Sequence, residues 1–192
     1  MKKKLIKYLL SIVIALLLIF LINPFYQNYK LKEKYSFKVQ SQNSSLSLNS
    51  FKGKVLVVYF GYMSCPDVCP TSLHYLSRVL QTFPKKDQDD FRGLFISLDP
   101  SRDSLKGLVS YTKYFNPHFL GATTSTENIN KIVKRYGAHY EKVYLKNSAL
   151  GYSIAHTSYF YIFNKKGKFI AQVNHFVQPK KLRKILVKLF KE

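Results

Sequence analysis

The sequence has few acidic residues, only two cysteines and no tryptophan. It contains 10 aspartates and glutamates against 31 lysines and arginines, which gives a formal net charge of +21. The lysines are spread along the chain and no groove-binding motif accompanies them, so we do not expect a nucleic-acid partner. We interpret the excess charge first as a solvated basic surface, and second as attraction to an anionic membrane or an acidic partner.

The chain still has enough apolar material for a core. Hydrophobic residues make up 46% of 192 positions, which suits one domain of ordinary size with a short appendage. Neither cysteine lies near the N-terminal apolar run, which excludes a lipid-modified N-terminus. No internal repeat is evident.

An apolar segment lies close to the start of the sequence. Residues 5–22 are apolar apart from Lys7 and Ser11, and as a helix they would be about 27 Å long, close to the roughly 30 Å of a bilayer's hydrocarbon core. A cleaved signal peptide also has a short apolar region, but it needs small residues at its cleavage site, and residues 23–29 contain none. We therefore expect a membrane anchor over residues 1–26, a polar linker over 27–34 and a domain over 35–192.

The charges around this anchor favour one orientation. The lysines at positions 2, 3, 4 and 7 would stay cytoplasmic, which places the domain on the extracytoplasmic side of the membrane, in the periplasm or its equivalent. The lysines at positions 30, 32 and 34 weaken this argument.

Both cysteines lie in one turn. Residues 61–71 read Gly-Tyr-Met-Ser-Cys-Pro-Asp-Val-Cys-Pro-Thr, between an apolar, β-branched segment and leucines and valines at helical spacing. This predicts a strand-to-helix turn, with a helix from Pro70, because proline is tolerated in the first helical turn. A thiol at a helix N-terminus ionises easily, and thiolate is the form that binds soft metals and attacks disulfides.

Two structural interpretations compete with a chemical role for Cys65 and Cys69. A structural disulfide across so small a loop would contribute only roughly 2 kcal/mol by chain entropy. Two buried free thiols are the other alternative, but the prolines and the aspartate around them indicate a surface turn. We therefore favour a chemical role for the pair.

Strands and helices alternate along the rest of the chain. Strands are predicted at 55–60, 91–98 and 119–122, helices at 70–83, 105–115 and 124–136, then a hairpin of 157–163 and 168–173 and a last helix from Pro179. We also expect a charged loop at 85–90, a capping box of Thr124 with Glu127 and an extended segment at 138–144. The order predicts an α/β fold, a thioredoxin-like mixed sheet flanked by helices, with an N-terminal transmembrane helix. Sites in such sheets gather at the carboxyl ends of the strands, where the cysteine turn lies.

Three segments resemble the Sco/SenC family of thioredoxin-fold copper proteins. They are Phe60-Gly-Tyr-Met-Ser-Cys-Pro-Asp-Val-Cys-Pro-Thr71, Phe95-Ile-Ser-Leu-Asp-Pro-Ser-Arg-Asp103 and Tyr152-Ser-Ile-Ala-His-Thr-Ser-Tyr-Phe-Tyr-Ile-Phe163, in the expected order. The resemblance covers roughly residue 35 to the C-terminus. Met63-Ser64 departs from the family, where a Thr with His or Tyr often precedes the first cysteine, and residues 146–153 have few acidic residues, which leaves the choice of partner open.

The resemblance implies a ligand set and a function. It implies that Cys65, Cys69 and His156 bind one copper ion, Cu(I) or Cu(II), and that the protein delivers copper to the dinuclear copper site of cytochrome c oxidase or keeps its thiols reduced. The partner would then be subunit II of that oxidase or another copper-accepting protein. Two thiolates and one imidazole make a soft site of low coordination number, which suits Cu(I). Spacing alone does not choose His156 among the five histidines.

Other polar residues near these segments have open roles. Asp67 is interpreted as a turn former or an acceptor behind the ligands. Asp99 and Asp103 resemble a family feature beside the metal site, with helix capping as the equal alternative. Met63 could lend a thioether to copper, although core packing is the simpler interpretation.

Three other functions remain open. Cys65 and Cys69 could form a redox-active disulfide in a thiol–disulfide oxidoreductase that acts on extracytoplasmic protein thiols without delivering copper. A peroxiredoxin-like peroxide reductase is a weaker alternative, because Thr71 lies on the wrong side of the nucleophilic cysteine. A copper-dependent sensor without a delivery role is the third.

Overall fold

A computed structural model describes residues 2–146, 148–174, 176 and 178–192 of the chain. The chain divides into two compact units, Met1–Lys34 and Tyr35–Glu192. The second unit contains the core and both cysteines.

The first unit is one helix, α1 (Lys2–Lys34). It contains a stretch, Ile12–Leu31, that is long and apolar enough to cross a membrane by length and composition. Residues 27–34, expected to form a polar linker, continue the helix instead. The expectation was wrong in this detail because Gln, Asn, Lys and Glu are good or tolerable helix residues even where they are not apolar.

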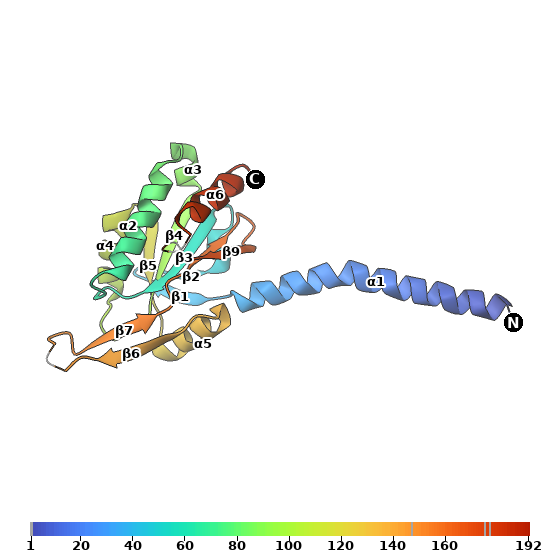
Figure 1. Ribbon diagram of the computed structural model, residues 1–192, viewed down its shortest axis with the longest axis horizontal. Coiled ribbons are helices and arrows are strands. Elements are labelled where there is room, and N and C mark those ends of the chain that lie inside the picture. The colour runs from blue at the N-terminus through green and yellow to red at the C-terminus, as the bar shows by residue number, and fades with distance from the viewer. Residues whose placement is uncertain (1, 147, 175, 177) are drawn as a thin grey trace. The chain divides into compact units, whose positions relative to one another are not determined.

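The second unit is built on a five-stranded mixed sheet in the order β5-β4-β3-β8-β9 (Figure 1). The strands are β3 (Val55–Gly61), β4 (Phe91–Ser97), β5 (Phe119–Ala122), β8 (Phe160–Phe163) and β9 (Phe169–Val173). Strand β3 pairs in parallel with β4 and antiparallel with β8, and β4 pairs in parallel with β5. The predicted α/β mixed sheet is therefore confirmed, with the cysteine turn at the carboxyl end of the central strand.

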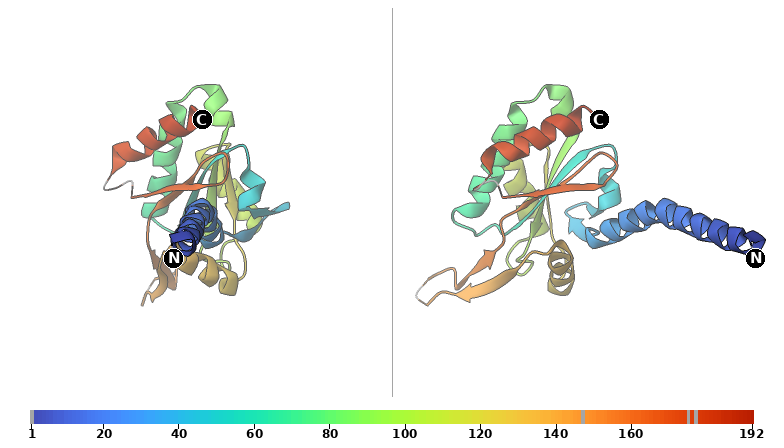
Figure 2. Two further views of the ribbon diagram at one scale, coloured as in Figure 1. Left: turned by 90° about the vertical axis from the view of Figure 1, so that its right-hand side faces the viewer. Right: turned by 45° about the vertical axis from the view of Figure 1, so that its right-hand side comes forward.

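Both faces of β3 are buried, which explains why its sequence is a continuous apolar run. Tyr59 points toward one helical layer, where its hydroxyl lies 3.0 Å from the Ser72 hydroxyl. Phe60 points the other way, and its ring meets Tyr136 edge-on at 5.1 Å. Helices therefore cover both sides of the sheet, as Figure 2 shows.

The helices of this unit are α2 (Val68–Gln81), α3 (Lys85–Asp89), α4 (Leu105–Phe115), α5 (Thr126–Tyr136) and α6 (Pro179–Phe190). Helix α4 was predicted to the residue, and Pro179 does open α6. The loop predicted at 85–90 is instead the short helix α3. The N-cap of α5 is Ser125, whose side chain accepts from the Asn128 N–H, so the predicted capping box at Thr124 was wrong by one residue.

Two small ribbons complete the unit. One pairs β1 (Lys38–Ser41) with β2 (Ser44–Ser47), followed by a short 3₁₀ helix, η1 (Leu48–Phe51). The other pairs β6 (Tyr140–Tyr144) with β7 (Tyr152–His156), and it extends away from the main sheet (Figure 1).

The second ribbon corrects the predicted hairpin. We expected one strand over 157–163 with His156 at its entrance. The segment is instead split, because β7 ends at His156 and β8 begins at Phe160. The chain changes partners between them, from β6 in the ribbon to β3 in the sheet.

Asp90 connects two loops at the amino-terminal edge of β3. Its carboxylate lies 3.1 Å from Lys54 Nζ and 2.9 Å from Lys165 Nζ, and these bonds, that of Lys165 foremost, hold the pKa of Asp90 below its ordinary value. A carboxyl group with a lowered pKa stabilises the fold above its ordinary pKa, and this contribution is lost as the pH falls through the lowered value.

We expect Asp90→Asn to lower the free energy of unfolding near pH 7 by about 1 kcal/mol or less, because both ion pairs are partly exposed. The difference from wild type should vanish in acid, where Asp90 is protonated in both states. Urea titrations over a pH series measure it. Glu141→Gln, which removes an exposed carboxylate with no ion pair among the described residues, is the control. A constant difference at every pH would contradict this account.

Candidate metal centre

The cysteine turn ends in the first turn of α2. Helix α2 begins at Val68, two residues before the predicted start at Pro70, so Cys69 already belongs to the helix. Cys65 lies in the preceding loop, and the Cys69 backbone N–H donates to the Cys65 sulfur over 3.4 Å. Asp67 bonds Thr71 through its carboxylate at 3.1 Å, which fits the expected turn-forming role.

Gly61, the last residue of β3, leaves room for the Cys69 sulfur. A Cβ atom at Gly61 would lie 2.8 Å from Cys69 Sγ and 2.7 Å from the Phe95 ring, both far inside normal contact distance. The Cys69 sulfur therefore packs directly against the Gly61 backbone at the end of β3. Cys69 is fully buried there, whereas Cys65 is partly exposed.

The two thiols are free and share their protons unequally. The hydrogen bond from the Cys69 thiol lowers the pKa of Cys65 to about 3, against the opposing effect of burial. The same bond, together with burial, raises the pKa of Cys69 far above its ordinary value. Cys65 is therefore the thiolate and Cys69 the thiol of the pair, and a metal that binds both must displace the Cys69 proton.

His156 reaches this pair from the β6–β7 ribbon. Its Nε2 atom lies 3.5 Å from Cys69 Sγ, and its Nδ1 atom lies 3.1 Å from the Thr157 carbonyl oxygen. A carbonyl accepts only from a protonated nitrogen, so this bond assigns the proton to Nδ1 and turns the lone pair of Nε2 toward the sulfur. The rings of Tyr59 and Tyr62 each meet the imidazole edge-on at 6.2 Å and fix its plane.

Cys65 and His156 line an open hollow, whereas Cys69 is buried and is not among the residues that line it. A pocket of about 400 Å³ is lined on one side by Cys65 and its loop and on the other by β7, including His156. As the side chains stand, no three cysteine, histidine or acidic side chains in the described part of the chain surround a common point that could hold a metal. Of the two cysteines, Cys65 is the one that is partly exposed and lines the pocket.

The other described histidines do not approach the cysteines. His74 and His139 are exposed, and His118 lies at the start of β5 beside Asp89, at 3.6 Å. His175 lies outside the described residues. Met63 packs its terminal methyl against Gly107 of α4, which fits the core-packing interpretation.

One loop supports both halves of the site. The segment after β4 carries Asp99 and Asp103, both almost fully buried. Ser104, and not either aspartate, caps α4 by accepting from the Gly107 N–H over 3.1 Å. The capping alternative for the two aspartates is therefore wrong.

Asp103 holds the cysteine loop. Its Oδ2 atom accepts from the Met63 backbone N–H over 2.9 Å and from the Ser97 hydroxyl over 2.6 Å. Burial raises the pKa of Asp103, and these two bonds oppose the rise.

Asp99 holds the ribbon that carries His156. It accepts from the Tyr152 hydroxyl over 2.8 Å, from the Ser101 hydroxyl over 2.7 Å and from Arg102 Nε. Burial alone would raise the pKa of Asp99, but the bonds from these three residues hold it below the ordinary value.

Arg102 also binds the ribbon to the loop after β4. Its guanidinium lies over the Tyr152 ring at 3.6 Å and donates to the backbone carbonyls of Tyr152 and Leu150 over 2.9 and 3.0 Å. The residues Asp99, Arg102 and Tyr152, called the ribbon tether below, fix β7 to the loop after β4. Our sequence analysis missed Tyr152, although it lies in the third segment of the resemblance.

These features define a thioredoxin-like protein whose central strand-to-helix turn brings two thiols under one imidazole from a separate ribbon. The SCO1/SenC family model matches residues 26–191, and the chain belongs to this family. The resemblance found in the sequence is thus confirmed.

Individual relatives agree with this assignment. An SCO2-like protein of Rickettsia conorii is 30% identical over 151 residues, which cover 78% of this chain and 73% of the relative. The chain is also similar to the copper-bound structure of ScoI from Bradyrhizobium japonicum, at 34% identity and a TM-score of 0.70, over 80% of this chain and 97% of that one. BsSco, described as a member of the Sco family of cytochrome c oxidase assembly proteins, shares the fold at 21% identity and a TM-score of 0.61, over 81% of this chain and 92% of that one.

We expect Gly61→Ala to displace the Cys69 sulfur, because the new methyl group needs the space that the sulfur occupies. Cys69, which is buried in the wild type, should then react with an alkylating reagent, and mass spectrometry of labelled peptides measures this. Gly93→Ala is the matched control, because its methyl would strike an aromatic ring, Phe119, at 2.7 Å but no sulfur. Both variants should lose about 1–3 kcal/mol of stability. Equal protection of Cys69 in the two variants would contradict the role of Gly61.

We expect Tyr152→Phe to loosen β7 while leaving the cysteine loop in place. The change keeps the ring under Arg102 and removes one hydrogen bond to the buried Asp99 carboxylate, which should raise local opening of β7 about tenfold or more. Hydrogen exchange of the amides of 152–156 measures it. Tyr144→Phe is the control, because Tyr144 faces Tyr152 across the ribbon but is 78% exposed. The tether would be refuted if both variants exchanged alike.

Proposed function

We propose that the protein binds one copper ion through Cys65, Cys69 and His156 and delivers it to the dinuclear copper site of cytochrome c oxidase. The observation that carries this proposal is the 3.5 Å contact between Cys69 Sγ and His156 Nε2, made by residues 87 positions apart. Membership of the SCO1/SenC family and the copper-bound ScoI relative support it.

The donor set suits copper chemically. Two sulfurs and one imidazole nitrogen are soft ligands in low number, the preference of Cu(I). Cu(II) could use the same ligands with an oxygen from solvent, since the pocket above the site is open. The Thr157 carbonyl supports the imidazole from behind, as is usual for histidine ligands of metals.

Transfer would proceed by ligand exchange, without a change in the oxidation state of copper. An acceptor protein entering the pocket meets Cys65 and His156 first, because both line it, whereas Cys69 lies deeper. Acceptor thiolates would replace His156 and then the cysteines, and the proton on Cys69 returns when its sulfur is released. The acceptor would be subunit II of the oxidase or another copper-accepting protein.

The first unit would hold this activity at a membrane. The stretch Ile12–Leu31 is long enough to span the hydrocarbon core as a single helix. The positive residues before it support an orientation with the domain 35–192 on the extracytoplasmic side.

We expect wild-type protein in detergent to bind one Cu(I), and His156→Ala, Cys65→Ser and Cys69→Ser to bind it far more weakly. Loss of a direct ligand should exceed the roughly 10- to 100-fold loss that follows removal of an outer partner. Competition with a chromophoric Cu(I) chelator measures the affinity. His74→Ala, an exposed histidine on α2, is the control. Unchanged affinity in His156→Ala would sink the ligand assignment.

A thiol–disulfide oxidoreductase is the second candidate. The free thiols and the lowered pKa of Cys65, about 3, favour it, because a thiolate is needed for attack on a disulfide. This activity needs the cysteines but not the imidazole as a ligand. The same His156→Ala variant separates the two functions, since it should lose copper but keep reductase activity on a protein disulfide if the second function holds.

A further inference from the structure

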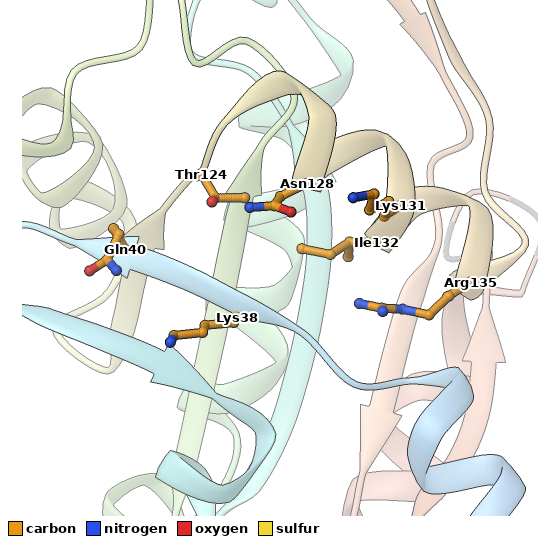
Figure 3. Close-up of a pocket in the computed structure, with 7 residues that line it drawn as sticks. All are labelled: Lys38, Gln40, Thr124, Asn128, Lys131, Ile132 and Arg135. Carbon is orange, nitrogen blue, oxygen red and sulfur yellow. The ribbon is translucent and has the colours of Figure 1, made fainter.

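A second polar pocket lies far along the chain from the cysteines, between β1 and α5 (Figure 3). Its volume is about 390 Å³, within the range of small-molecule sites. Three basic side chains line it: Lys38 from β1, and Lys131 and Arg135 from α5. No acidic residue lines it.

Neutral hydrogen-bonding groups complete the lining. Gln40 comes from β1, Thr124 from the segment before α5 and Asn128 from its first turn, and buried Ile132 contributes the one apolar side chain. Figure 3 shows these side chains on the two walls of the pocket, with the Arg135 guanidinium directed back toward β1. Several donors from different directions suit an anion with many acceptor oxygens, such as phosphate, better than a planar carboxylate.

The walls of the pocket are fixed to each other before any ligand binds. Gln40 and Thr123 exchange two backbone hydrogen bonds, of 2.7 and 2.9 Å. At the other end, the Tyr136 hydroxyl donates to the Tyr35 carbonyl over 2.8 Å. A ligand would therefore meet two walls that are already held together, which reduces the entropy lost on binding.

The three basic side chains use only part of their hydrogen-bonding capacity within the protein. Arg135 Nη2 donates to the Ser36 carbonyl over 2.8 Å, which orients the guanidinium and leaves its other N–H groups available. Lys38 forms no ion pair with any described residue. Lys131 pairs with Glu127, but both side chains are more than half exposed, and such a pair is worth little.

We propose that this pocket binds a phosphate group, in the first place that of an anionic phospholipid headgroup. The choice of the lipid follows from the sequence, because Lys38 stands seven residues after Leu31, the end of the stretch that could cross a membrane. Seven residues span at most about 25 Å, so the pocket stays within that distance of the end of the stretch. Anionic lipids attract basic groups that lie close to the membrane surface. Free phosphate offers the same chemistry without the lipid.

The test uses ¹⁵N-labelled full-length protein in zwitterionic detergent at near-physiological salt, where long-range attraction is screened. Dioctanoyl phosphatidylglycerol is titrated in one arm, sodium phosphate in a second and sodium acetate in a third, and NMR follows the amides of Gln40, Thr124 and Asn128. Saturable shifts with the lipid at concentrations about tenfold lower than with phosphate support the headgroup. Saturation by phosphate at equal or lower concentration supports the pocket with free phosphate as its ligand.

Variants decide whether the pocket or the total charge is responsible. Lys38→Gln and Arg135→Gln should each weaken binding about tenfold, and Lys184→Gln, which removes one exposed charge from α6 beside α2, on the sheet face opposite α5, less than twofold. The Lys38 side chain forms no ion pair with a described residue, so Lys38→Gln should fold normally and a loss of binding would report on the pocket. Equal weakening in all three variants, shifts without saturation, or acetate binding as tightly as phosphate would overturn the proposal. Copper affinity should be unchanged in these variants. A negative result for phosphate binding would therefore leave the copper proposal unaffected.

Discussion

The contact between the Cys69 sulfur and the His156 imidazole joins two parts of the domain that share no strand pairing. Cys69 packs against the end of the central strand at Gly61, whereas His156 ends a two-stranded ribbon whose strands pair only with each other. The sulfur is buried because the glycine lets it approach the backbone, and the imidazole faces it because the Thr157 carbonyl holds the other ring nitrogen. The geometry of the site thus depends on how the ribbon is held against the sheet.

One short loop provides that connection. Asp103 bonds the backbone of the cysteine loop, and Asp99 bonds the ribbon through Tyr152 and Arg102. Both carboxylates are buried, which is costly unless each is fully hydrogen-bonded. Because they stand four residues apart on one rigid turn, the positions of the sulfurs and of the imidazole are set by the same piece of backbone.

The sequence allowed most of the fold to be predicted, because its strands and helices are strongly patterned. The buried run of β3, the period of α4 and Pro179 at the start of α6 are local signals, and the structure confirmed them. The break between β7 and β8 was missed, although residues 156–158 (His-Thr-Ser) are polar, because β-branched Thr157 is common in strands and the division follows from the change of partner strand. The ribbon tether was not predicted, for a related reason. Nothing in the sequence distance of 53 residues indicates that the Tyr152 hydroxyl meets the Asp99 carboxylate.

The different attachment of the ligands sets an order for release of a bound metal. Cys69 is buried in the first turn of a packed helix that follows a fully buried strand, so moving its sulfur requires deformation of the core. An isolated two-stranded ribbon is marginally stable by itself, and beyond its own pairing it is held chiefly by the tether. Movement of His156 therefore costs less free energy than movement of the buried Cys69. An acceptor that competes for the metal would displace the imidazole first and meet a two-sulfur site, whose linear geometry is acceptable to Cu(I) but poor for Cu(II). If Cys65, Cys69 and His156 bind copper as proposed, this difference in attachment would favour transfer of the reduced ion.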